Sequence, residues 1–218
     1  MDDEKIEIAI VLYDGVTALD AIGPYEILSR IPNAATRFVS NERGVRRTDQ
    51  GSLGLMADYR LEEVSRPSVV VIPGGPGQSQ QMANEQLLEW IRSVHKVTSW
   101  TTSVCTGSLI LAAAGILNGV RATSHWLAID TLASFGAIPV RERVVFDGKI
   151  VTGAGVSAGI DLGLQLLAQM NGEEKSKEVQ LWVEYDPQPP FDCGSPEKAG
   201  PQICERLRSR SRFHQKER

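Results

Sequence analysis

Short apolar runs alternate with stretches of helical periodicity along this chain. Continuous runs rich in β-branched residues are typical of strands that are buried on both faces of a parallel sheet. We predict three such strands, at 6–13, 68–75 and 97–104. Apolar residues that recur every three or four positions predict amphipathic helices. We predict three of these, at 18–31, 84–96 and 157–172.

The alternation of strands and helices favours an α/β fold with a mostly parallel sheet that is covered on both sides. A hairpin is predicted at 144–153, because Asp147-Gly148 is a turn sequence between two β-like segments. The chain of 218 residues can bury one full core, so we expect a single domain over 1–218. The basic, polar end at about 205–218 is expected to be a helical tail or disordered.

Composition and charge narrow the function classes. A net charge of -4 gives no reason to expect nucleic acid or an acidic membrane surface as a partner. No apolar run is long enough to span a membrane, and the acidic start leads directly into a strand, so we expect no signal peptide. The three cysteines have no CxxC spacing, which argues against a disulfide framework or a metal site and favours a cytoplasmic protein.

One cysteine, Cys105, falls where the third predicted strand passes into a helix through Thr106-Gly107-Ser108. Ligands of α/β sheets gather beyond the carboxyl ends of the strands, and a helix N-terminus favours a thiolate. Gly107 allows the backbone to approach its neighbours closely at this turn. We therefore expect Cys105 to be a nucleophile with a lowered pKa; the alternative is a small, inert, buried side chain.

Three further features could serve this cysteine. Asp20 lies after the first strand and can face Cys105 if the two strands adjoin. An acid beside a thiolate is disfavoured as a second anion, so the pKa of Asp20 should rise, and the protonated group would donate a hydrogen bond to sulfur. The backbone N–H groups of Gly74 and Gly75, in "IPGGPG", could stabilise developing negative charge. His125 could support the residues that contact the substrate without contacting it itself, or it could be a histidine that only packs against its neighbours.

These residues stand in longer stretches that resemble a known family. The chain resembles the ThiJ/PfpI superfamily (class I glutamine amidotransferase-like) and, within it, the isocyanide hydratases, over about residues 6–196. The stretches that carry the resemblance are "SVCTGSLILAAAGILNGVRATSHW", "GAIPVRERVVFDGKIVTGAGVSAGID" and "VQLWVEYDPQPPFDCGSP". The resemblance implies a flavodoxin-like α/β sandwich with the cysteine at a nucleophile elbow.

The resemblance also assigns roles. It implies that Cys105 is the nucleophile, that Asp20 and Thr106 are catalytic, and that the backbone of Gly74, Gly75 and Thr106 stabilises charge. Peptidase-like members have histidine where this chain has Thr106, which argues against proteolysis. Ala154 stands in a glycine-rich loop where relatives often have glycine.

The implied reaction adds water to an isocyanide and gives an N-substituted formamide through a thioimidate on Cys105, with Asp20 as acid and base. It needs no cofactor or metal, and the family implies a homodimer. Two alternatives stay open. The chain could be a sensor domain like those of AraC-type regulators, although we expect no DNA-binding region because it ends at Arg218. It could also be another cysteine-dependent enzyme of amidase or glyoxalase type.

Overall fold

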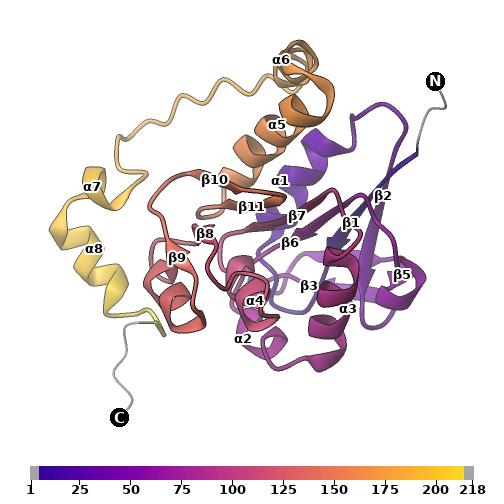
Figure 1. The fold of residues 1–218 in the computed structure, drawn as a ribbon. Coiled ribbons are helices and arrows are strands. Elements are labelled where there is room, and N and C mark those ends of the chain that lie inside the picture. Colours follow the sequence, from indigo (N-terminus) through magenta and orange to yellow (C-terminus); the bar gives the residue numbers. More distant parts are fainter. Residues whose placement is uncertain (1–4, 214–218) are drawn as a thin grey trace.

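A seven-stranded sheet forms the centre of the protein, which is described over residues 5–213 of a computed structural model (Figure 1). The strand order is β10-β11-β7-β6-β1-β2-β5, and every neighbouring pair is parallel except β10 and β11. The strands are β1 (Ile6–Val11), β2 (Ala34–Ser40), β5 (Tyr59–Arg60), β6 (Val69–Ile72), β7 (Trp100–Val104), β10 (Val144–Asp147) and β11 (Ile150–Gly153). Two small sheets pair β3 (Gly44–Arg47) with β4 (Gly54–Ala57) and β8 (Arg121–Ala122) with β9 (Ile138–Pro139).

Helices cover both faces of the sheet, as the strand–helix alternation predicts. They are α1 (Ala18–Leu28), α2 (Gln78–Gln81), α3 (Glu85–His95), α4 (Gly107–Ala113), α5 (Ala158–Asn171), α6 (Glu173–Trp182), α7 (Pro196–Ala199) and α8 (Pro201–Arg208), with short 3₁₀ segments η1 (Leu61–Glu63) and η2 (Ile129–Phe135). Successive residues of β1 enter opposite cores. Ala9 and Val11 pack with α3 and α4, whereas Ile8 and Ile10 pack with α1 and α5. The expected α/β sandwich with a mostly parallel sheet is therefore confirmed.

Local sequence signals explain several element boundaries. The side chain of Asn84 accepts a hydrogen bond from the Leu87 N–H at 3.3 Å and so caps α3. Gly172, with a φ of 89°, ends α5 in a conformation that glycine adopts readily. The predicted hairpin is present as β10 and β11, with Gly148 at a φ of 57° in the turn.

One detail differs from expectation. The first strand does not adjoin the strand before Cys105, because β6 lies between β1 and β7. The C-terminal region contains two helices, α7 and α8; Cys204 in α8 is buried, and Cys193 before α7 is exposed. Of the tail expected at 205–218, residues 214–218 lie outside the described part. Within residues 5–213, no helix is long and apolar enough to cross a membrane.

Candidate active site

The candidate site lies where three parallel strands end side by side. β1 leads into the loop before α1, which carries Asp20 in its first turn. β6 leads into the glycine turn Gly74–Pro76, and β7 leads directly to Cys105. Because β6 is the strand between the other two, its glycine turn separates and bridges the aspartate and the cysteine.

Cys105 occupies the turn between β7 and α4 with a φ of 57°, which is rare for a residue other than glycine. Its N–H donates to the carbonyl oxygens of Gly153 and Ala154, both at 3.0 Å. Its own carbonyl accepts from the hydroxyls of Ser108 at 3.2 Å and Ser124 at 3.0 Å. These four bonds hold the strained turn in place.

Two glycines let the turn pack against the end of β6. A Cβ on Gly107 would overlap with the carbonyl oxygen of Ile72. A Cβ on Gly74 would lie 2.5 Å from the Thr106 nitrogen, which is closer than side chains approach in folded proteins. The expectation that Gly107 permits close backbone approach is confirmed, and Gly74 has the same function on the opposite side of the contact.

Asp20 is fully buried beside the cysteine. Its Oδ2 accepts the Gly74 N–H at 3.0 Å, while Oδ1 has no partner of normal hydrogen-bond geometry among the described residues. Burial raises the pKa of Asp20 to about 7, although the Gly74 N–H and the Cys105 thiol each lower it. The raised pKa agrees with the sequence-based expectation, but burial is its main cause, where we expected a second anion.

The expected low pKa of Cys105 is wrong. Burial and the Asp20 carboxyl group raise the pKa of this thiol, and the N–H groups of Thr106 and Val156 lower it only in part. The helix that begins after it, α4, has only seven residues, so its N-terminus contributes little positive potential against this burial. Asp20 and Cys105 are a coupled pair in which the thiol keeps its proton while the Asp20 carboxyl group titrates near pH 7.

Thr106 and the glycine turn are linked by a reciprocal pair of hydrogen bonds. The Thr106 hydroxyl accepts the Gly75 N–H at 3.0 Å and donates to the Gly75 carbonyl, with an O–O distance of 3.4 Å. The N–H groups of Gly74 and Gly75 are therefore already bonded to the side chains of Asp20 and Thr106. This differs from the expectation that they would stabilise charge on a substrate; among the three expected residues, only the Thr106 N–H is directed at the sulfur.

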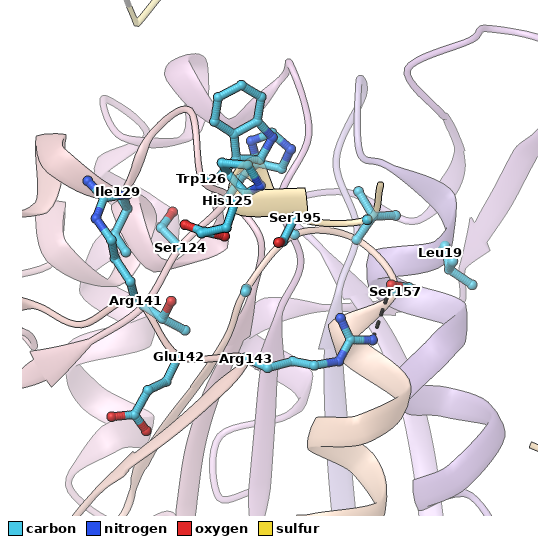
Figure 2. A pocket seen from close by; sticks show the side chains of 17 residues that line it. Leu19, Ser124, His125, Trp126, Ile129, Arg141, Glu142, Arg143, Ser157 and Ser195 are labelled. Atoms are coloured by element: carbon cyan, nitrogen blue, oxygen red, sulfur yellow. Dashed lines mark hydrogen bonds between the residues drawn. The ribbon is translucent and has the colours of Figure 1, made fainter. Parts of the chain in front are cut away.

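A cavity of about 510 Å³ lies next to residues that flank the pair, although neither Asp20 nor Cys105 lines it (Figure 2). Leu19, next to Asp20, and Val156, whose N–H bonds to the Cys105 sulfur, are both part of its wall. The wall consists of Leu19, Thr123, Ser124, His125, Trp126, Ile129, Arg141, Glu142, Arg143, Ala154, Gly155, Val156, Ser157, Gly194, Ser195, Pro196 and Glu197. Figure 2 shows that one side carries the Trp126 and His125 rings, and that Arg143 donates to Ser157 at 3.2 Å on another side.

His125 lies in this wall without a hydrogen bond to the cysteine or the aspartate. Its Nδ1 accepts the Leu127 N–H at 3.3 Å, and burial lowers its pKa, so the ring is neutral at pH 7. Ala154 also lines the cavity, and its φ is not positive, so alanine is not strained where relatives often have glycine. Within residues 5–213, no three His, Cys, Asp or Glu residues are grouped closely enough to hold a metal ion.

Sequence reasoning missed three contributors to the site. Tyr13, two residues after β1, is buried and donates to the Pro73 carbonyl at 2.8 Å. Its place at the end of the apolar run 6–13 could have indicated a residue near the strand ends where the site lies. The segment Gly194–Glu197 lines the cavity, and Arg212 contacts the glycine turn. No sequence pattern connects these C-terminal residues to a strand end so far away in the chain.

Comparisons with known proteins agree with this arrangement. Residues 6–169 match the model of the DJ-1/PfpI family. The isonitrile hydratase of Pseudomonas putida is 41% identical over 206 residues, which are 94% of this chain and 90% of that protein. A crystal structure of a ThiJ/PfpI family protein from Pseudomonas syringae superposes with a TM-score of 0.91 at 36% identity, over 93% of this chain and 84% of that one. The transcriptional regulator CdhR of Pseudomonas aeruginosa is 32% identical over 58% of this chain and 38% of its own length.

Proposed function

This chain belongs to the DJ-1/PfpI family, and we propose that within it the protein is an isocyanide hydratase, which adds water to R–N≡C to give the formamide R–NH–CHO. The observation that carries the proposal is the buried pair of Asp20 and Cys105 beside a cavity. A single nucleophile and a single acid–base group are what this reaction requires. A relative of the same overall length that is named isonitrile hydratase supports the same activity.

The first half of the reaction joins sulfur to the terminal carbon of the isocyanide. Because burial raises the pKa of Cys105 above that of Asp20, the shared proton rests on sulfur before the substrate binds. During attack the proton passes to the Asp20 carboxylate and from there to the isocyanide carbon, while the C–S bond forms. The product is the thioimidate R–N=CH–S–Cys105, and Asp20 is left as a carboxylate.

In the second half, water cleaves the thioimidate. The Asp20 carboxylate takes a proton from water as its oxygen bonds to carbon, and this proton is delivered to the substrate nitrogen. The tetrahedral intermediate R–NH–CH(OH)–S–Cys105 then collapses: Asp20 accepts the hydroxyl proton, the C=O bond forms and the C–S bond breaks. A pKa near 7 suits a group that must both donate and accept protons at neutral pH.

Backbone N–H groups around the sulfur support these steps. The N–H groups of Thr106 and Val156 bond to sulfur and stabilise the thiolate as it leaves. The turn that carries Cys105, with a φ of 57°, serves in this proposal as a nucleophile elbow that presents sulfur toward the cavity. Thr106 contributes its hydroxyl to the glycine turn, so that its role in catalysis is to fix Gly75 and, through the same turn, Asp20.

The R group of the isocyanide is proposed to occupy the cavity next to the pair. Trp126, His125 and Ile129 form an apolar and aromatic part of the wall, which suits a hydrophobic substituent of the substrate. Arg143 and Arg141 lie in the opposite part but are paired with Asp161 at 2.5 Å and Asp130 at 2.6 Å. Because those charges are already neutralised, the cavity favours an uncharged substituent over an anionic one.

We further propose that the protein is a cytoplasmic homodimer. Three free cysteines, of which Cys105 must stay reduced to react, suit a reducing compartment. Leu181, Trp182 and Phe191 expose 78%, 70% and 75% of their surface around the end of α6 and the segment after it. A second copy that covers these side chains would remove apolar surface from water. Light scattering at several protein concentrations would establish the oligomeric state.

Neither alternative has an observation of equal weight. Similarity to the regulator CdhR covers 129 residues and only 38% of that protein. A glutathione-independent glyoxalase from Caenorhabditis elegans is 24% identical over 57% of this chain. This similarity is too low to assign a glyoxalase substrate to this protein. Both alternatives would retain a cysteine at the strand end, so the activity test must distinguish them.

The decisive test incubates the purified protein with an alkyl and an aryl isocyanide and follows formamide by chromatography. We expect turnover by the wild type and none by Cys105→Ala, with methylglyoxal and simple amides as parallel substrates for the two other enzyme classes. Mass spectrometry of the wild type quenched during turnover should reveal a thioimidate adduct on Cys105, which Asp20→Asn should form poorly because it lacks the group that carries the proton. Absence of turnover by the wild type, or normal turnover by Cys105→Ala, would refute the proposal.

A further inference from the structure

The last described residues of the chain return to the turn that holds the catalytic pair. Arg212 lies beyond α8 and forms four hydrogen bonds with the turn after β6 and the start of α2. Its Nη1 donates to the Pro76 carbonyl at 2.5 Å and to the Ser79 hydroxyl at 3.2 Å. Its Nη2 donates to the Gln78 side-chain oxygen at 2.8 Å and to the Gly75 carbonyl at 3.4 Å.

Residues on either side of Arg212 hold it against the turn. Ser211 is buried, and its Oγ accepts the Phe213 N–H at 3.3 Å. The Phe213 ring packs against the core that contains α3 and α4. Earlier in the same C-terminal region, the Arg208 guanidinium lies 5.6 Å from the centre of the Trp126 ring, which lines the cavity. Arg212 is therefore placed by packing, and its contacts are not those of an isolated surface side chain.

The turn that Arg212 contacts is the one that positions the catalytic groups. On the inner side, the Gly74 N–H holds Asp20 at 3.0 Å and the Gly75 N–H holds Thr106 at 3.0 Å. On the outer side, the carbonyls of Gly75 and Pro76 accept from Arg212. Gly75 has a φ of 134°, a conformation that glycine leaves easily without external contacts. The peptide group that carries the Gly75 N–H is joined to the Gly75 carbonyl through a single Cα, so anchoring this carbonyl limits the rotation of that N–H.

We propose that Arg212 is a positioning residue for the hydration reaction: its guanidinium fixes the Gly74–Pro76 turn from outside, so that the turn holds Asp20 and Thr106 against Cys105. The inference rests on the proposed function for its turnover readout, but the arrangement at Cys105 can be measured without an isocyanide. None of the residues that Arg212 hydrogen-bonds lines the cavity, so it is expected to act on the chemical step and not on substrate binding.

The charged and titratable groups around the pair give the direction of the second readout. Asp49 and the Cys105 thiol act on Asp20, and Tyr13 faces both members of the pair. Arg212 is the cation that acts on Tyr13 and lowers its pKa. In the proposal, loss of Arg212 loosens the turn and with it the Gly74 N–H that favours the Asp20 carboxylate. Asp20, the group of the pair that ionises first, then releases its proton less readily.

The test compares Arg212→Ala with the control Arg210→Ala, which removes an exposed arginine whose side chain forms no hydrogen bond with the described residues. We expect Arg212→Ala to lower kcat about tenfold or more while KM changes less than about twofold, because displaced catalytic groups slow the chemical step. The pH midpoint for alkylation of Cys105 by iodoacetamide, followed by mass spectrometry, should move upward by about half a pH unit or more. Arg212→Lys, which keeps one donor group, should be intermediate.

Each outcome decides the inference. Wild-type kcat and an unchanged alkylation midpoint in Arg212→Ala would overturn it, and so would a raised KM with an unchanged kcat. If the wild type turns over no isocyanide but the alkylation midpoint still moves in Arg212→Ala, the proposed function fails while the positioning role stands. If Arg212→Ala is unfolded at the assay temperature, Arg212→Gln is measured by the same two readouts and decides in the same way.

Discussion

The N–H of Gly74 donates to Oδ2 of Asp20 at 3.0 Å, although the two residues are 54 positions apart in the sequence. This bond is the one polar contact of normal geometry that the carboxyl group makes, since Oδ1 has no such partner among the described residues. The oxygen without a partner is thus free for the Cys105 proton, while the bonded oxygen fixes the orientation of the group. The predictions below follow from this arrangement.

Asp20→Asn keeps an oxygen that can accept the Gly74 N–H but removes the proton donor and acceptor. We expect kcat for isocyanide hydration to fall by about 10²-fold or more, because general acid–base catalysis contributes rate factors of this size. The rise in activity around pH 7, where Asp20 titrates, should vanish in this variant. Steady-state kinetics between pH 5 and about pH 9 would measure both effects. Activity within a few-fold of the wild type would contradict the assigned role.

Asp20 also makes the stability of the fold depend on pH. Its pKa in the folded protein is about 7, well above that of an aspartate in an unfolded chain, so between about pH 4 and pH 7 the folded state binds the extra proton. The free energy of unfolding should therefore decrease as pH rises through this window, by up to about 4 kcal/mol from this group. Urea denaturation at several pH values would measure the decrease.

The control for this experiment is Glu89→Gln, which removes an exposed carboxyl group from α3. Its unfolding profile should follow that of the wild type, whereas Asp20→Asn should be less sensitive to pH and more stable near pH 8. An Asp20→Asn profile parallel to the wild type across the whole window would show that Asp20 is not the source of the pH dependence.

The fold and the proximity of Asp20 to Cys105 could be predicted from the sequence because their signals are local. The apolar runs of β1, β6 and β7 read directly as strands, and Cys105 stands at a strand end before a glycine. The position of β6 between the other two strands could not be predicted this way, since strand order depends on contacts between distant segments. The prediction of a low pKa for Cys105 was wrong for a related reason. The sequence shows that a helix begins after Cys105, but it does not show the burial that outweighs the effect of the helix N-terminus.

Thr106→Val retains the shape of the side chain but removes the oxygen that accepts the Gly75 N–H. This buried N–H would be left unpaired, at a cost of about 1–3 kcal/mol in the free energy of unfolding. Thr106→Ser keeps the hydroxyl and should retain most of the stability and kcat. Denaturant midpoints and kcat of the two variants would be compared. Equal losses in both variants would mean that the methyl group of Thr106, not its hydroxyl, is important.

Gly107→Ala places a Cβ where the carbonyl oxygen of Ile72 already lies. The ends of β6 and α4 would have to separate, and we expect a loss of about 3 kcal/mol or more in stability together with loss of activity. Gly194→Ala is the matched control, because a Cβ there has open space and the φ is not positive. Thermal melting of both variants would measure the difference. A Gly107→Ala protein as stable as the control would disprove the close packing of this turn.

His125 should be dispensable for proton transfer although it lies in the cavity wall. Burial lowers its pKa, its Nδ1 is occupied by the Leu127 N–H at 3.3 Å, and its ring forms no hydrogen bond with Cys105 or Asp20. We expect His125→Gln to keep the pH dependence of kcat and to change kcat less than about fivefold, whereas KM for bulky isocyanides should change because the wall is altered. A pH profile that loses the limb near pH 7, as in Asp20→Asn, would assign the acid–base role to His125 instead.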